Sequence, residues 1–230
     1  MNRNAGSPNE WLSFGLALVG GYGDAAGFVL AKTFTGHVTG SLVLATIGVA
    51  EHDWRVTLGH VCAVVFFLAG IPLSILVERA LAARSSWRLL PTIIGIEIIL
   101  IAAAYFVLVS HAVGGMELFV VCMSLALGLQ NGAFRRTGGI SVHTTYLTGT
   151  ITSLIGAQMD RFSSPTIPMP AATHNGKVGV FCGEWIAFVL GGSAGVVMVL
   201  RFGAVGILGA ALLLLTVLFG NSIAERKDCH

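Results

Sequence analysis

Charged side chains are scarce in this chain. Asp, Glu, Lys and Arg make up 10% of the 230 residues, whereas hydrophobic residues make up 55%. Soluble domains carry about 25% charged residues, so the composition excludes a water-soluble globule and indicates an integral membrane protein. The net charge is +2 and no basic stretch is interleaved with aromatics. We therefore expect no nucleic-acid partner.

Cysteine is also rare, and its positions form no pattern. Cys62, Cys122 and Cys182 fall within apolar runs, and Cys229 lies in the tail. None has the spacing of a zinc site or is placed for a disulfide. The histidines include no His-x-x-x-His pair. We therefore expect neither a metal site nor a cofactor.

Long apolar runs are abundant. A membrane-spanning helix needs about 20 apolar residues, and the sequence predicts six spans. These are Trp11–Ala31, Val56–Val77, Leu90–Val109, Glu117–Phe134, Val178–Leu200 and Phe202–Gly220. Arg201 and Gly203 would divide the last two into a helical hairpin. The first run has no cleavage site of the signal-peptide type, so we expect it to remain in the mature protein.

Two shorter apolar segments, Thr39–Ala50 and Leu147–Met159, follow leads rich in Thr, Gly and His. They could be full spans, giving eight, or half-helices that re-enter and leave on the side they entered. Cytoplasmic loops carry an excess of Lys and Arg, and eight spans would divide the 13 cations almost evenly. With re-entrant segments only Lys32, Arg55 and Arg201 face outward. We therefore predict an all-α membrane protein with six spans, two re-entrant half-helices and both termini in the cytoplasm.

One sequence unit occurs twice in the chain. Its first copy begins at Gly21–Phe28 (GYGDAAGF) and continues to Thr39-Gly40, and its second begins at Gly128–Phe134 (GLQNGAF) and continues to Thr148-Gly149. Apolar runs broken by Gly and Thr in corresponding positions of two repeats point to a binding site at the repeat interface.

Each copy also ends in an apolar segment with a Phe-x-x-Gly step, Phe67 to Gly70 and Phe188 to Gly191. We place repeat one at about 11–80 and repeat two at about 117–201, within a single transmembrane domain that has a polar tail at 221–230. Three spans separate the copies in the six-span arrangement, so the two repeats are predicted to be inverted relative to each other.

Asp24 is the most informative polar residue, because it lies well inside the first apolar run. An ionised carboxylate at such depth is costly unless it is paired or hydrated. It is either a protonatable or cation-coordinating group, or a neutral acid capping a helix break. Its counterpart Asn131 is uncharged, an asymmetry that suits proton coupling. Glu97, midway along the third span, either completes a proton path with Asp24 or bonds as a neutral acid to a neighbouring helix.

In the re-entrant arrangement, two half-helices would direct their N-termini at the middle of the bilayer. Helix N-termini carry partial positive charge and free N–H groups, so two facing ends could hold an anion or the negative end of a polar solute. Alternatively, the small residues there simply permit close helix packing. The predicted substrate-binding residues are Asp24, Asn131, Gln130, Thr39, Gly40, Ser41, Thr148, Gly149, Thr150, His37 and Tyr146.

The same motifs resemble the YoaK family, a group of uncharacterised bacterial multi-pass inner-membrane proteins. The likeness extends over roughly residues 12–215 and rests on four segments, Gly21–Ala25, Thr39–Ser41, Gly128–Phe134 and Thr145–Thr150. Ser41 departs from the pattern, which has Asn at that place. The resemblance implies a multi-pass fold in the inner membrane and implies no activity.

These observations favour a small-solute transporter or channel-like permease that is proton-coupled through Asp24 and Glu97. The alternative is a non-transporting assembly or scaffold subunit, in which Asp24 and the Thr-Gly steps serve packing. An enzyme is not expected, because His37 and Ser41 form the only local base and nucleophile and lack a Gly-x-Ser context. The predicted partners are a small polar solute or anion and the lipid bilayer, with a homodimer as an option.

Overall fold

The computed structural model describes residues 8–82, 89–111, 113–133 and 174–228. All regular elements in these ranges are helical, and no strand occurs there, as the sequence predicts. The helices are α1 Pro8–Ala31, α2 Val38–Ala50, α3 Trp54–Ala82, α4 Leu89–Val109, α5 Gly115–Ala133, α7 His174–Phe202, the 3₁₀ helix η2 Gly203–Ile207, and α8 Leu208–Asp228.

Five stretches of helix are long and apolar enough to cross a membrane. They are Glu10–Ala31, Trp54–Leu81, Leu89–Val109, Gly115–Ala133 and Cys182–Ser222. The fifth has 41 residues, about twice the length that a bilayer requires. It contains both α7 and α8, which are separated at η2, where Gly203 has φ +58. Glycine adopts this left-handed conformation without strain, so the break falls where the sequence predicts it.

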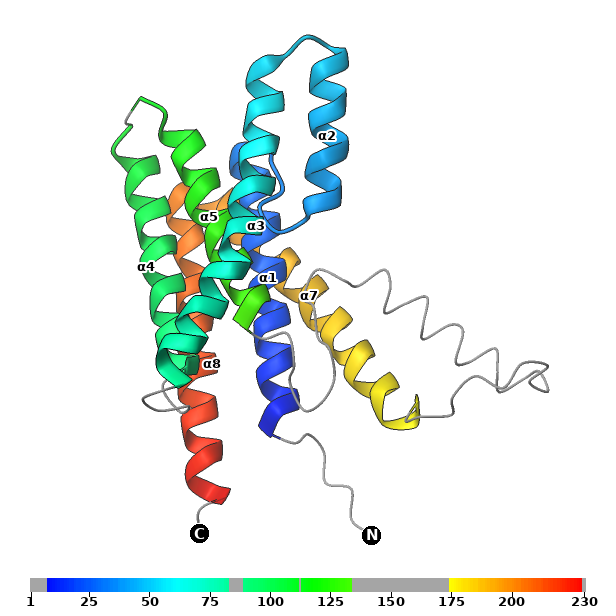
Figure 1. The fold of residues 1–230 in the computed structure, drawn as a ribbon, viewed down its shortest axis with the longest axis vertical. Helices are drawn as coiled ribbons and strands as arrows, with labels where there is room; N and C mark the ends of the chain where they lie inside the picture. The colour runs from blue at the N-terminus through cyan, green and yellow to red at the C-terminus, as the bar shows by residue number, and fades with distance from the viewer. Residues whose placement is uncertain (1–7, 83–88, 112, 134–173, 229–230) are drawn as a thin grey trace, which may run out of the picture.

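The long helices form a bundle in which two pairs pack most extensively, α1 with α7 and α3 with α5. Helix α4 packs on α5 and α8. In Figure 1, α1 begins and α8 ends at the same lower end of the molecule, and α2 and α3 form a hairpin at the opposite end. The apolar core lies between α1, α4, α5 and α8 and contains Leu16, Ile94, Phe119 and Leu214.

Both extensive helix pairs depend on glycine at their point of closest approach. In the α1–α7 pair, a Cβ on Gly21 would overlap the carbonyl of Phe188, and one on Gly191 would overlap the carbonyl of Leu18. Small residues at such positions let two backbones approach where lipid supplies no hydrophobic drive for helix association.

The α3–α5 pair uses the corresponding positions of the repeated unit. A Cβ on Gly128 would overlap the carbonyl of Phe67, and one on Gly70 would lie 2.7 Å from the carbonyl oxygen of Leu125. The glycines of both Phe-x-x-Gly steps, Gly70 and Gly191, therefore make the same kind of contact, each with the helix that carries the opposite copy's first motif.

Candidate functional site

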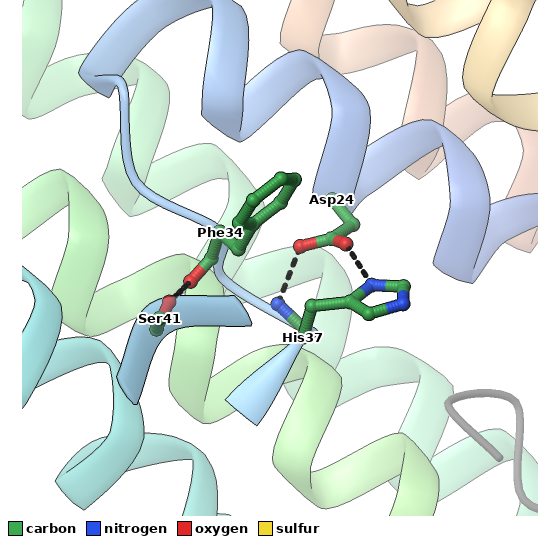
Figure 2. A network of polar contacts seen from close by, with 5 residues as sticks. Asp24, Phe34, His37 and Ser41 are labelled. Atoms are coloured by element: carbon green, nitrogen blue, oxygen red, sulfur yellow. Dashed lines mark hydrogen bonds and ion pairs between the residues drawn. The ribbon is translucent and has the colours of Figure 1, made fainter. Parts of the chain in front are cut away.

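Asp24 lies in the interior of α1, and both of its carboxylate oxygens have partners. Its Oδ1 accepts the backbone N–H of Gly36 at 2.7 Å, and its Oδ2 lies 2.6 Å from Nδ1 of His37 (Figure 2). The Asp24 residue is 4% exposed. An anionic side chain at this depth is tolerated because it is paired and hydrogen-bonded.

The chain brings these groups together by reversing direction after α1. Lys32, the residue after the helix, has φ +56, and its N–H bonds to the Phe28 carbonyl at 2.8 Å, a common way to end a helix. The following segment lies back along α1, where the Phe34 ring stacks on Phe28 with centroids 4.4 Å apart. Gly36 fits closely, since a Cβ there would lie 3.1 Å from Cδ1 of Leu127 on α5.

Helix α2 therefore begins beside the middle of α1. His37 is the residue before its first turn, and the Ser41 N–H donates to the His37 carbonyl at 2.9 Å. The hydroxyl of Ser41 donates to the Phe34 carbonyl at 2.7 Å (Figure 2). The Asp24 carboxylate thus lies at the N-terminal end of α2, where the helix dipole stabilises negative charge.

The His37 ring links this cluster to a third element. Its side chain is 36% exposed, and the ring meets Phe188 of α7 edge-on with centroids 5.9 Å apart. With a charged imidazole the contact to Asp24 is an ion pair, and with a neutral imidazole it is a hydrogen bond from Nδ1–H. Protonating Asp24 weakens both of its contacts, because charge-assisted hydrogen bonds are about twice as strong as neutral ones.

Gln130 and Asn131 lie near the end of α5. The Gln130 amide donates to the Leu16 carbonyl at 2.7 Å, and Leu16 precedes Asp24 by eight residues, or about 12 Å of helix. Among the described residues, Oε1 of Gln130 and Oδ1 of Asn131 are buried without a hydrogen-bond partner. No hydrogen bond joins either amide to Asp24 among the residues that the structure describes.

The remaining predicted residues have varied surroundings. Thr39 is exposed. The Ser41 hydroxyl bonds to the Phe34 carbonyl, as described above, and Gly40 packs against the Phe34 ring. Of the predicted binding residues of the second copy, Tyr146, Thr148, Gly149 and Thr150 lie outside the described residues.

Glu97 lies on α4 and is completely buried. Neither of its carboxyl oxygens has a partner within the described part of the chain. Helix α4 packs on α5 and α8 and not on α1, so Glu97 is not joined to Asp24. Ser124 on α5 is likewise buried with its hydroxyl unpartnered among those residues.

The structure also buries an acid that the sequence gives no reason to place in the interior. Glu184, near the predicted start of a span, is 5% exposed and accepts a hydrogen bond from the Ser13 hydroxyl. Its neighbour Gly183 lies against the Phe14 ring. The only sequence signal for this contact is a glycine and a serine on the two helices that meet.

Comparison with known proteins supports the resemblance of the motifs. A family described as "Protein of unknown function (DUF1275)" matches residues 12–220. The chain is also similar to the UPF0700 transmembrane protein YoaK of Bacillus subtilis (strain 168), with 25% identity over 145 residues. The aligned part covers 61% of this chain and 63% of that relative's length. No solved structure matches the chain significantly.

Proposed function

Given that the chain belongs to the DUF1275 family, we propose that it is a small-solute transporter of the bacterial inner membrane that couples transport to protonation of Asp24. The observation that carries the proposal is a buried carboxylate held by His37 and by the Gly36 N–H at the start of a short helix. Ionisable residues within the membrane most often mark substrate or proton pathways.

The proposed architecture is an inverted repeat with six spans. Its support is the pair of equivalent contacts, Gly21 and Gly191 between α1 and α7, and Gly128 and Gly70 between α5 and α3. Helices α1 and α5 run in opposite directions, because Gly23 lies against Leu127 whereas the earlier Leu16 meets the later Gln130. A pseudo-two-fold axis in the membrane plane relates repeats of this kind.

In this proposal α2 is a re-entrant half-helix. Its support is the reversal after Ala31, which returns the chain to the level of Asp24 before α2 turns back towards the end where α1 finishes (Figure 1). A short helix that starts in the interior leaves its first N–H groups without intrahelical partners. Those groups and the His37 imidazole give the N-terminus of α2 a positive potential, and the Asp24 carboxylate lies next to it.

Protonation of Asp24 provides the coupling step. The ionised carboxylate holds Gly36 and His37 and neutralises the start of α2. When Asp24 is protonated, its hydrogen bonds to Gly36 and His37 weaken. The start of α2 and a protonated His37 then become available to an anion. We therefore propose symport of a proton and a small anion, with two states that differ in the contacts of segment 32–37.

The runner-up is a non-transporting assembly or scaffold subunit. The specific observation in its favour is that both Asp24 oxygens are already satisfied within the chain. In that reading the cluster simply fastens α2 to α1, and protonation of Asp24 has no role.

Thermal unfolding of the purified protein with a panel of small anions, sugars, amino acids and nucleobases, at two pH values, tests the proposal. A ligand at one hundred times its dissociation constant stabilises the fold by about 2.7 kcal/mol. We expect an anion that stabilises the wild type more at the lower pH, and loss of that pH dependence in Asp24→Asn. The matched control is Glu51→Gln, which changes an exposed acid.

The same anion should then enter liposomes containing the protein in response to a proton gradient, and Asp24→Asn should abolish the response to the gradient. A panel without any stabilising ligand at either pH, together with a lower melting temperature of Asp24→Asn at both pH values, would favour the scaffold reading.

A further inference from the structure

A second polar feature lies at the end of the molecule opposite the chain termini. A cavity of about 310 Å³ is lined by the end of α1 with the residues that follow it and by the first turns of α3 and α5. Its polar lining comprises Lys32, Thr33, Arg55, His60 and Glu117. The Asp24 cluster does not include any of these residues.

The polar side of this cavity carries two cations and one acid. Lys32 is exposed, and Arg55 has its Nη2 3.6 Å from Oε1 of Glu117, with the two side chains 85% and 48% exposed. An ion pair of this length and exposure is weak, so it leaves much of the guanidinium free for a ligand. Asp53 caps α3 by accepting the N–H groups of Arg55 and Val56, and it is not among the residues that line the cavity.

His60 forms part of the inner wall of the cavity. Its side chain lines the cavity, the residue is 3% exposed, and its Nδ1 is buried without a hydrogen-bond partner among the described residues. Buried polar atoms are almost always paired with protein or another group. Because this atom is almost inaccessible to solvent, the charges of Lys32 and Arg55, and not Nδ1 of His60, are the feature of the cavity that favours an anion.

The opposite wall is apolar and includes Ala31, Val56, Met116 and Val120. We propose that this cavity binds an organic anion, a carboxylate or phosphate attached to a short apolar group. Lys32 and Arg55 bind the charged end, and the apolar wall contacts the chain. Ligand cavities range from about 300 to 1,000 Å³, so this one takes a small molecule or part of a lipid.

The position of the cavity links it to the proposed transport path. Thr33 lines the cavity, Thr35 is buried with an unpartnered hydroxyl in the described part of the chain, and Gly36 reaches Asp24. Segment 32–37 therefore leads directly from the cavity to the Asp24 cluster. If the proposed function is right, the cavity is the outer entrance to the transport path. The binding of an anion in the cavity does not depend on that function.

Binding of hexanoate to the full-length protein in neutral detergent tests the proposal, with hexanamide as its uncharged isostere. We expect hexanoate to bind and hexanamide to bind at least about tenfold more weakly, a difference typical of a lost charged contact. Lys32→Gln and Arg55→Gln should each weaken hexanoate by a similar factor. Arg201→Gln, an exposed cation outside this cavity, should leave the affinity unchanged.

A lipid headgroup is the other source of the same chemistry. Native mass spectrometry after reconstitution in nanodiscs of phosphatidylglycerol or phosphatidylcholine distinguishes a bound lipid from a soluble anion. Retention of phosphatidylglycerol that falls in Lys32→Gln and Arg55→Gln, but not in Arg201→Gln, identifies a lipid as the occupant. Hexanoate binding without lipid retention identifies a soluble organic anion.

The proposal is overturned if neither probe depends on Lys32 and Arg55, or if Arg201→Gln has the same effect as they do. Both variants alter exposed side chains, and a melting temperature equal to that of the wild type verifies their fold. Anion binding in this cavity without any effect of Asp24→Asn on transport would sustain this site and remove the proposed coupling.

Discussion

Asp24 and Glu97 are both buried acids, but they differ in their hydrogen-bond partners. Both oxygens of Asp24 have partners, one from the backbone and one from an imidazole. The carboxyl of Glu97 has none within the described residues. Because burying an unpaired charge is far more costly than burying a neutral acid, we predict that Glu97 is a neutral acid, whereas the contacts of Asp24 stabilise its charged form.

This difference predicts how the two acids respond to substitution. Asp24→Ala removes the acceptor of the buried Gly36 N–H, and a buried group left without its partner costs about 1–3 kcal/mol. Asp24→Asn keeps an oxygen acceptor and should lose less. Glu97→Gln replaces one neutral group by another and should change the free energy of unfolding by roughly 0.5 kcal/mol or less.

Thermal or denaturant unfolding in detergent measures these three variants side by side. A loss for Glu97→Gln as large as that for Asp24→Ala would show that Glu97 is ionised or paired, contrary to the contacts described here.

At the scale of elements, close approach of helices governs the fold. Gly21 and Gly128 occupy the same place in the two copies of the repeated unit, and each lies against the carbonyl of a phenylalanine on the partner helix. A carbonyl in a helix cannot move away as a flexible side chain can. The helix pairs α1–α7 and α3–α5 therefore separate if either glycine gains a side chain.

Gly21→Ala and Gly128→Ala should each destabilise the protein by about 1–3 kcal/mol, the usual cost of overpacking a close contact. The control is Gly95→Ala in α4, where nothing lies within 4 Å of the added carbon. There the change should stabilise the helix by up to about 1 kcal/mol, because alanine is the better helix former. Equal melting of Gly21→Ala and Gly95→Ala would contradict the packing argument.

At the scale of the whole molecule, the two ends of the bundle differ in what they contain. The turn after α2, the turn after α4 and η2 lie at one end, and the start of α1 and the end of α8 lie at the other (Figure 1). Lys32, Arg55 and Arg201 are near the first end, while α8 carries Arg226 and Lys227 in its last turn. If the six-span prediction is right, the first end faces outward and the chain termini lie in the cytoplasm.

Labelling from outside the cell tests the topology. In a cysteine-free background, Glu51→Cys and Ser110→Cys, both exposed, should react with a membrane-impermeant maleimide on intact cells. Ser222→Cys on α8 should react only after the membrane is permeabilised. Eight full spans would instead place positions 51 and 110 on the cytoplasmic side, and protection of both in intact cells would refute the re-entrant arrangement.

Much of the architecture could be predicted from local features of the sequence. The apolar runs placed the long helices, since each depends only on its own length and composition. The break at Gly203 could be predicted because a glycine and an arginine interrupt an otherwise continuous apolar stretch. The Phe-x-x-Gly steps were recognisable as repeated features, although the sequence did not reveal that each packs against the first helix of the other copy.

The site was predictable only in part. Asp24 and His37 were both candidates, but their contact depends on the direction the chain takes after Lys32, and that turn is stabilised by tertiary packing on α1. The sequence also did not reveal that the protein's own Asp24 carboxylate lies at the start of α2, where an anion is predicted to bind. The burial of Glu184 could not be foreseen, because it depends on Ser13 from a helix 171 residues away in sequence.

The sequence by itself determined that this is a helical membrane protein with an acid within its first long apolar helix. Composition and run length suffice for those properties, because the bilayer acts on each segment separately. Only the tertiary structure decided which buried polar groups have partners, which helices touch through their glycines, and where a cationic cavity forms. Those properties depend on pairs of groups that are distant in sequence, and only folding brings the two members of each pair within contact distance.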